Sequence, residues 1–249
     1  MARGKKLTYA QKNCVASAGK LMHQTNMVSE GSRIGVALSG GMDSFTLLQV
    51  LRHRQRTLPF PIELMVLHVN PGFAPDNHAS LLAWTAKHGL AAHMEVSDHG
   101  PRAHSEENRS NSPCFLCCNN RRKRLFELCD TYNLTHLAFG HIAEDLVTTF
   151  FLNLFQAGRV EGLGMKESFF QGKLTVIRPL LWLEKSVVRR AAAAWNLPII
   201  KNPCPSAHTA KRSQILQWLE EKFKDDPKIK GSVYGALRRL QLDTTMKRS

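Results

Sequence analysis

A short segment with two adjacent glycines carries the residues best suited to bind a phosphate. Residues 39–44 read Ser-Gly-Gly-Met-Asp-Ser and follow residues 34–38, an apolar run typical of a buried strand. Two glycines allow a tight turn whose backbone N–H groups point at an anion, and a following helix N-terminus strengthens that site. Asp43 is no phosphate donor, but a carboxylate beside a polyphosphate suits Mg²⁺. The spacing matches neither G-x-x-x-x-G-K-[ST] nor G-x-G-x-x-G, and a plain turn capped by Asp43 is the alternative.

Three of the six cysteines have a spacing that suits a metal centre or sulfur chemistry. Cys114 and Cys117 form a C-x-x-C unit, and Cys204 lies far along the chain. Three interpretations fit: a [4Fe–4S] cluster held through three irons, a tetrahedral zinc completed by His208, or a catalytic pair of thiols that forms a persulfide or disulfide. The spacing alone leaves all three open.

The remaining cysteines and the chain ends bear on the redox setting. Cys118 is an extra thiol beside the C-x-x-C unit, whereas Cys14 and Cys129 fall on predicted helices and are expected to be small buried residues. No secretory signal and no run of about 18 apolar residues is present, so we expect a cytoplasmic protein without a membrane partner. Thiols stay reduced there, so clustered cysteines indicate metal binding or catalysis.

Basic residues stand close to these cysteines in the sequence. Four follow the C-x-x-C unit and two follow Cys204, namely Arg121, Arg122, Lys123, Arg124, Lys211 and Arg212. Positive charge near a thiol lowers its pKa, and the same side chains suit contacts with RNA phosphates. A solvated helix face is the alternative interpretation of both groups.

The charge of the whole chain favours a nucleic-acid partner. Its 249 residues carry 34 basic and 20 acidic side chains, a net charge of +14, and 43% of them are hydrophobic. That balance excludes disorder, a disulfide-dense miniprotein and a collagen-like chain. The surplus lies mainly in residues 151–249, with 18 basic against 8 acidic side chains, while residues 51–150 carry ten of each. RNA or DNA binding is therefore expected, with a merely solubilising surface as the alternative.

The pattern of apolar runs predicts the elements that must position these groups. Buried strands are expected at 34–38, 64–69, 92–96, 136–139 and 174–181. Helices are expected at 8–29, 43–56, 77–88, 118–132, 143–155, 184–195, 209–223 and 232–240, with a polar loop at 98–113. Strands that alternate with helices predict an α/β fold with a doubly wound, mostly parallel five-stranded sheet and extra N- and C-terminal helices. We divide the chain into an N-terminal helical segment (1–29), an α/β domain (30–183) and a C-terminal helical extension (184–249).

The motif S-G-G-x-D-S after a buried strand resembles that of the PP-loop ATP pyrophosphatases. Residues 67–70, at the end of the second strand, and Gly-His-Ile-Ala-Glu-Asp at 140–145, similar to the family's G-H-x-x-D-D, fit the same resemblance. Glu144 stands where the family usually has its first Asp. The resemblance implies a Rossmann-like domain that splits ATP between its α and β phosphates with Mg²⁺. The ATP-binding residues that it implies are Leu38, Ser39, Gly40, Gly41, Asp43, Ser44, His68, Gly140, His141 and Asp145.

A C-x-x-C unit, a basic helix, the G-H-x-x-D-D-like motif and a distant lone Cys together resemble the tRNA 2-thiocytidine synthetase group, over about residues 30–220. The resemblance implies a [4Fe–4S] cluster on Cys114, Cys117 and Cys204, a tRNA substrate, and sulfur from sulfide or a persulfide carrier protein. Ala207 stands where members often have another Cys, which is not thought to be a ligand.

These observations predict an ATP-dependent tRNA sulfurtransferase that adenylates a pyrimidine carbonyl, most simply of cytidine, and replaces its oxygen with sulfur. The residues expected to act in catalysis are Asp43, Asp145, Lys123 and Cys204, and those expected to contact RNA are Arg121, Arg122, Arg124, Lys211 and Arg212. The alternatives are a PP-loop tRNA ligase or amidating enzyme with structural zinc, and a non-catalytic nucleotide-dependent RNA-binding module. A homodimer is left open.

Overall fold

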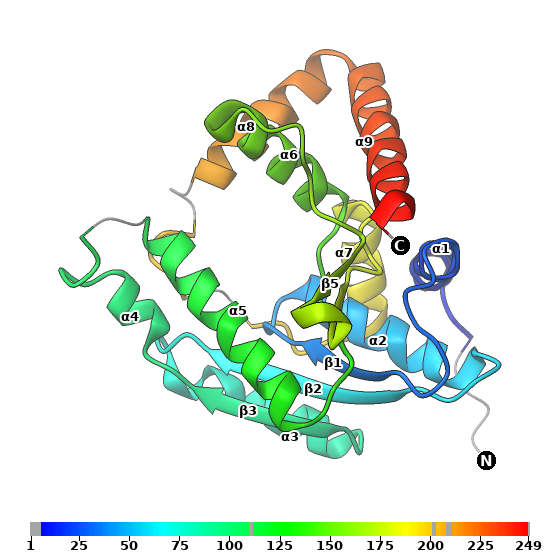
Figure 1. Cartoon of the computed structure of the whole chain (residues 1–249), viewed down its shortest axis with the longest axis vertical. Coiled ribbons are helices and arrows are strands. Elements are labelled where there is room, and N and C mark those ends of the chain that lie inside the picture. Colours follow the sequence, from blue (N-terminus) through cyan, green and yellow to red (C-terminus); the bar gives the residue numbers. More distant parts are fainter. Residues whose placement is uncertain (1–5, 110–111, 201–202, 208–210, 249) are drawn as a thin grey trace.

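A mostly parallel sheet forms the centre of the computed structural model, which describes residues 6–109, 112–200, 203–207 and 211–248 (Figure 1). The described residues form six strands in the order β3-β2-β1-β4-β6-β5. Their bounds are β1 Arg33–Ala37, β2 Glu63–Asn70, β3 Ala91–Val96, β4 His136–Ala138, β5 Lys166–Phe169 and β6 Leu174–Ile177. All neighbours pair in parallel except β5 with β6. The five predicted strands are therefore the five parallel ones.

The sixth strand, β5, corrects the five-strand prediction. It pairs antiparallel with β6 at the sheet edge, from Lys166 opposite Ile177 to Phe169 opposite Leu174. Its sequence, Lys-Glu-Ser-Phe, has neither an apolar run nor a clear alternation of apolar and polar residues. An edge strand is covered on fewer sides than a central one, so its sequence needs less apolar character and gives a weaker signal.

Helices cover both faces of the sheet, which confirms the doubly wound prediction. Their bounds are α1 Tyr9–Gln24, α2 Met42–Thr57, α3 Ala79–Lys87, α4 His99–Ala103, α5 Pro113–Thr131, α6 Ala143–Ala157, α7 Lys185–Trp195, α8 Lys211–Asp225 and α9 Pro227–Arg248. Helices α1, α2 and α7 pack on one another, whereas α5 packs on the opposite face against β2 and β4. Helices α8 and α9 pack with each other and against α6.

Several boundaries differ from those predicted. Helix α1 ends at Gln24 rather than near residue 29, and a 3₁₀ turn, Pro75–His78, precedes α3. The short helix α4 lies inside the predicted 98–113 loop. The last helix is longer than predicted at both ends. Such shifts are expected because caps and tertiary contacts, which periodicity does not register, decide where helices end.

The buried cysteines behave as the sequence suggested. Cys14 on α1 belongs to the large apolar core between the sheet and α1, α2 and α7, and Cys129 on α5 belongs to the smaller core on the opposite face. Both side chains are fully or almost fully buried, and burial raises their pKa values, to about 11 and about 12. Both residues are therefore parts of the core. Among the described helices, none is both long and apolar enough to cross a membrane.

Candidate active site

The glycine-containing turn between β1 and α2 forms a closed loop held by its own serines. The Ser44 hydroxyl donates to the Gly41 carbonyl at 2.9 Å, and the Ser39 N–H donates to the Ser44 oxygen at 3.1 Å. Gly40 has φ +88°, a backbone conformation that glycine adopts without strain. Gly41 is the N-cap of α2 and makes no side-chain capping bond, so the first N–H groups of the helix remain available to an anion.

Asp43, in the first turn of α2, has the features of a cation ligand. Its Oδ1 atom is buried and has no hydrogen-bond partner among the described residues. Burial, together with the nearby Asp145 and Glu144 carboxylates and against the opposing charge of Lys185, raises the pKa of Asp43 to about 6. A buried carboxylate oxygen without a partner, beside a phosphate-binding turn, fits Mg²⁺. A capping role for Asp43 is not observed, because the N-cap is Gly41.

The segment after β4 lies directly against this loop. A Cβ atom placed on Gly140 would lie 2.9 Å from backbone atoms of Asp43 and Ser44, so only glycine permits the approach. Asp145, in the first turn of α6, accepts from the Ile142 N–H at 2.8 Å through Oδ2. Its Oδ1 pairs with Arg212 of α8 at 2.7 Å. Asp145 thus fixes the start of α6 and draws a cation of the C-terminal region toward the loop.

Glu144, the departure from G-H-x-x-D-D, has a structural partner. Both of its carboxylate oxygens accept from the Lys185 N–H, each at 3.0 Å, so Glu144 caps the N-terminus of α7 from outside that helix. Burial raises its pKa, against the effect of that backbone hydrogen bond. The longer side chain of Glu144 therefore links the first turn of α6 to the first turn of α7.

One cavity of about 490 Å³ joins the groups that the motifs predicted separately. Of the predicted site residues it is lined by Leu38, Ser39, Asp43, Ser44, Gly140, His141, Asp145, Arg121, Arg122 and Arg212. It is also lined by Phe115, Cys118, Phe139, Leu163 and Arg178, to which the sequence assigned no ligand. The structure therefore places Ser39 and Ser44 of the glycine turn, the carboxylates of Asp43 and Asp145, and four arginines around one space. Gly40 and Gly41 do not line it.

His68 lies outside the lining of this cavity. Side chains alternate along β2, and Leu67 and Val69 are the ones that line the cavity. The His68 Nδ1 atom bonds the Leu38 carbonyl at 2.6 Å, and burial lowers its pKa. His68 thus holds the end of β1, immediately before the glycine turn, instead of lining the space for a ligand.

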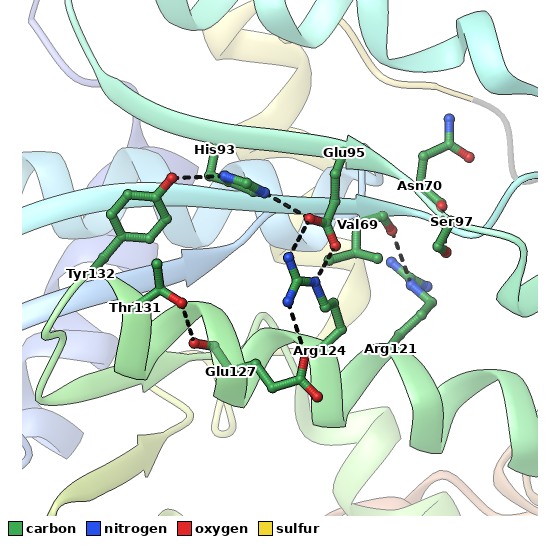
Figure 2. Close-up of polar contacts among 10 residues, drawn as sticks. All are labelled: Val69, Asn70, His93, Glu95, Ser97, Arg121, Arg124, Glu127, Thr131 and Tyr132. Carbon is green, nitrogen blue, oxygen red and sulfur yellow. Dashed lines mark hydrogen bonds and ion pairs between the residues drawn. The ribbon is translucent and has the colours of Figure 1, made fainter.

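Arg124 is engaged by the protein itself (Figure 2). Its guanidinium makes two bonds to the Glu95 carboxylate of β3, at 2.6 and 2.8 Å, and a third to Glu127 at 2.9 Å. His93 and Tyr132 extend the network, since Tyr132 bonds His93 and His93 bonds Glu95, both at 2.8 Å. Arg124 thus fixes α5 on the sheet and does not line the cavity, and the RNA contact expected of it stays a prediction.

Two other predicted residues also lie away from the cavity lining. Lys123 lines a separate, apolar cavity of about 400 Å³ between α5 and the β5–β6 turn. Lys211, at the start of α8, is exposed. Arg121 does reach the cavity, and its Nε–H donates to the Val69 carbonyl at 3.2 Å. The basic run on α5 therefore divides by helical position, with Arg121 and Arg122 facing the cavity.

The three candidate ligand thiols converge from two distant segments. Cys114 and Cys117 occupy the first turns of α5, and Cys204 precedes α8. The three lie close enough for Cys204 to raise the pKa values of both other thiols. Among the described residues, however, no three His, Cys, Asp or Glu side chains are spaced to hold a metal ion as they stand. His208, which the zinc interpretation needs, lies outside the described residues.

The basic residues of α5 do not lower the pKa values of the Cys114 and Cys117 thiols below the ordinary value, although the sequence predicted that they would. Burial raises the pKa of Cys114, and it raises that of Cys117 to about 11. Arg121 lowers the pKa of Cys117, in the predicted direction, but burial outweighs it. Both thiols accordingly remain protonated near neutral pH, and a metal would have to displace their protons.

Arg178 is the charged residue of the cavity for which the sequence predicted no role. It follows β6 directly, at the carboxyl-terminal ends of the strands where the glycine turn also lies, and is 9% exposed. The available signal was its place: a charged residue directly after a buried strand of a parallel sheet lies where ligands bind. Because the strand was predicted to continue to residue 181, Arg178 was expected inside the strand and not at its carboxyl-terminal end.

Comparison with known proteins agrees with this geometry. Residues 11–219 match the model of the PP-loop domain. The tRNA-cytidine(32) 2-sulfurtransferase of Syntrophotalea carbinolica is 33% identical over 235 residues, covering 92% of this chain and 91% of that protein. The protein of the same name from Geobacter sulfurreducens is 32% identical, covering 90% and 88%.

The fold also matches that of a solved structure, the U34-tRNA thiolase NcsA from Methanococcus maripaludis with its [4Fe–4S] cluster. The TM-score is 0.74 at 21% identity, over 96% of this chain and 86% of that one. On the motif, the cavity and the sequence matches taken together, the chain belongs to the PP-loop family and, within it, to the family of the tRNA-cytidine(32) 2-sulfurtransferases.

Proposed function

We propose that the protein uses ATP to replace the carbonyl oxygen of a cytidine in tRNA with sulfur. One observation carries the proposal: the glycine turn, Asp43 and four arginines share one cavity, and Cys118, neighbour of the C-x-x-C unit, lines it too. The phosphate-binding turn and the arginines thus share one space, and Cys118 brings the first turns of α5, which also carry Cys114 and Cys117, to its border. The similarity to tRNA-cytidine(32) 2-sulfurtransferases supports cytidine as the target.

The first step is the activation of the base. A carbonyl oxygen is a poor leaving group, so sulfur cannot displace it directly at a useful rate. Attack of that oxygen on the α-phosphorus of ATP, with loss of pyrophosphate, converts it into a phosphate ester whose leaving group is AMP. The α2 N-terminus and the turn before it bind the phosphates, and Asp43 would hold Mg²⁺, which offsets the charge that develops on them.

The arginines of the cavity would receive the RNA. Arg121 and Arg122 come from α5 and Arg212 from α8, so cations of two separate helices face the same space. Phe115 lines the cavity and is 61% exposed, which suits stacking on a base that has left the RNA stack. The target base has to be single-stranded or flipped out to reach the α-phosphorus.

The thiols would hold an iron–sulfur cluster. Cys114, Cys117 and Cys204 supply three thiols from two segments, which fits a [4Fe–4S] cluster with one iron left open, and the structural match to NcsA with its cluster supports it. Such a cluster, when bound, supplies an iron at which inorganic sulfur can be held. Sulfide attacks the activated carbon, a C–S bond forms and AMP leaves with the original oxygen.

The sulfur donor and the place of action complete the proposal. Sulfide supplies the sulfur, either as such or released from a persulfide carrier protein by a dithiol reductant that becomes a disulfide, and the cytoplasm, where tRNA and reduced thiols occur together, is the site of action. Lys123 lines the other cavity, and the catalytic role expected of it stays a prediction.

The products of ATP cleavage test the activation step. We expect AMP and pyrophosphate, formed only when unmodified tRNA is present, and little ADP. Asp43→Asn should abolish this release, whereas Glu127→Gln, a change on the outer side of α5, should not. ADP and phosphate as the products would contradict the PP-loop chemistry.

Metal analysis tests the assignment of the thiols. After anaerobic reconstitution we expect a brown protein with about four irons per chain, and loss of the colour in Cys204→Ser. Cys129→Ser serves as the matched control, because Cys129 lies on α5 as well but is buried in the smaller core instead of near the C-x-x-C unit. A colourless protein that contains one zinc and no iron would support the alternative of a structural zinc site.

A further inference from the structure

A buried arginine contacts the only histidine among the residues that line the cavity in the described part of the chain. His141 lies after β4 and Arg178 after β6, strands that are neighbours in the sheet. Both residues therefore lie at the carboxyl-terminal ends of the parallel strands, where the glycine turn also lies. The Arg178 Nε–H donates to the His141 Nδ1 atom at 3.2 Å. The family resemblance implied that His141 binds ATP, and no role was expected for Arg178.

The orientation of Arg178 is fixed by its other partners. One terminal nitrogen, Nη1, donates to the Gly164 carbonyl at 2.6 Å and forms an ion pair with Glu167 of β5. The side chain is only 10% exposed, so water competes little for these bonds. A guanidinium is planar and rigid, so bonds at Nη1 also determine where Nε points. The antiparallel strand β5, absent from the sequence prediction, thus supplies the anchor.

The contact determines which ring nitrogen of His141 carries the proton. A guanidinium only donates hydrogen bonds, so the Nδ1 atom that receives its N–H must be unprotonated. Burial and the charge of Arg178 lower the pKa of His141 to about 4; Asp145 opposes them and Arg212 adds to them. The ring is therefore neutral at physiological pH, and its single proton resides on Nε2.

We propose that Arg178 is a positioning residue that holds His141 as a neutral Nε2–H donor, and that this N–H binds a phosphate oxygen of ATP. The inference rests on the proposed function, because it needs ATP in this cavity. His141 shares the cavity with Ser39 and Ser44 of the glycine turn and with the unpartnered Asp43.

A neutral donor fixed in this way has a chemical advantage. It stabilises the charge that develops on the phosphate oxygens without having to reorient during the reaction. It also cannot take up a proton from the adenylated base, because its only other nitrogen is occupied by Arg178.

The ring nitrogens of His141 in the ligand-free protein give the first test. Nitrogen-15 NMR of ring-labelled histidine should show one neutral Nε2–H form of His141 from pH 5 to pH 8. Arg178→Met should yield a mixture of the two neutral forms, and its protonation should move to higher pH. Arg33→Met, which removes an exposed arginine paired with Glu63 at the amino-terminal ends of β1 and β2, should leave His141 unchanged. A wild-type His141 protonated on Nδ1 would overturn the proposal.

ATP binding gives the second test, through a double-mutant cycle. Measured by calorimetry with Mg²⁺ and without tRNA, His141→Ala and Arg178→Met should each weaken ATP binding about tenfold. His141→Gln, whose amide keeps an N–H donor, should bind several-fold more tightly than His141→Ala. The double variant should be no weaker than His141→Ala, because Arg178 acts through His141. Losses that simply add would contradict a positioning role.

A second variant of Arg178 and the ATP affinity of the wild type complete the tests. Arg178→Lys, which retains a cation for Glu167 but lacks the planar guanidinium, replaces Arg178→Met if that variant does not fold. It should also give a mixture of the two neutral forms of His141, with a smaller rise in the pKa because the charge is kept. Failure of the wild type to bind ATP at all would contradict the proposed function, while the NMR result still decides how His141 is protonated. ATP binding with an unchanged affinity in His141→Ala would overturn the inference alone.

Discussion

The backbone N–H of Ile200 donates a hydrogen bond to the carbonyl of Gly40, at 2.9 Å. A Cβ on Gly40 would lie 3.3 Å from the Ile200 side chain, so the two residues also pack closely. Gly40 belongs to the phosphate-binding turn, and Ile200 stands four positions before Cys204. The turn that would bind ATP and the segment that carries the third thiol are therefore directly bonded to each other.

We predict that Ile200→Pro weakens ATP binding about three- to tenfold, the range expected for losing one backbone hydrogen bond. Proline lacks the N–H, so the bond to Gly40 cannot form. Ile200→Val keeps the N–H and a branched apolar side chain, and should bind ATP as the wild type does. Calorimetry on the ligand-free protein measures both, and equal affinities in the two variants would mean that the bond does not shape the turn.

A methyl group at position 140 should push the segment after β4 away from the glycine turn. In Gly140→Ala the new Cβ would lie 2.9 Å from backbone atoms of Asp43 and Ser44, which cannot move as a flexible side chain could. We expect a loss of about 1–3 kcal/mol in unfolding free energy and a large loss of ATP affinity. Gly231→Ala on α9 is the control, since nothing lies near its Cβ position and it should not destabilise. Urea denaturation measures both, and a Gly140→Ala variant of unchanged stability would disprove the tight approach.

Replacing Asp43 should stabilise the protein while it removes Mg²⁺-dependent ATP binding. Burial raises the pKa of Asp43 to about 6, above its unfolded value near 4, so the folded state binds the proton more tightly. Stability from this group is greatest below pH 4 and is lost as pH rises to 6. Asp43→Asn should therefore exceed the wild type by about 1–2 kcal/mol at pH 7, and by little at pH 4. Thermal unfolding without ATP measures the difference, and a less stable variant at pH 7 would contradict the origin of the shift.

The opposite pH dependence is expected at Glu95. Its hydrogen bonds to Arg124 and His93 lower the pKa of the Glu95 carboxyl to about 2, so its contribution to stability is complete above pH 5 and disappears as pH falls to 2. Glu95→Gln should cost about 1–2 kcal/mol at pH 7, and the deficit should shrink below pH 5.

Glu127→Gln supplies the comparison for Glu95, because Glu127 also binds Arg124 but its side chain is 61% exposed. We expect at most a few tenths of a kcal/mol from it. Chemical denaturation from pH 3 to pH 7 measures both variants, and a deficit in Glu95→Gln that stays constant across that range would argue against an ionic contact.

What the sequence could reveal depended on whether a feature was local. The turn at residues 39–44 and the five parallel strands were predictable, because apolar runs and glycine spacing are written in contiguous residues. The strand β5 was not, since Lys-Glu-Ser-Phe has no apolar pattern and forms a strand only by pairing with β6.

Contacts between distant segments explain the other differences. Arg124 looked like part of an RNA-binding run, but its partner Glu95 lies 29 positions earlier on the edge strand β3. Arg178 reaches His141 across 37 positions. The pKa values of Cys114 and Cys117 were expected to fall, but burial, which the sequence does not report, raises them.

The most direct test of the central claim is mass spectrometry of nucleosides from tRNA treated anaerobically with the reconstituted protein, ATP, Mg²⁺ and sulfide. The account predicts 2-thiocytidine that depends on ATP, is lost in Asp43→Asn and in Cys204→Ser, and persists in Cys129→Ser. An unthiolated tRNA with the reconstituted wild type, or full thiolation by Cys204→Ser, would contradict it.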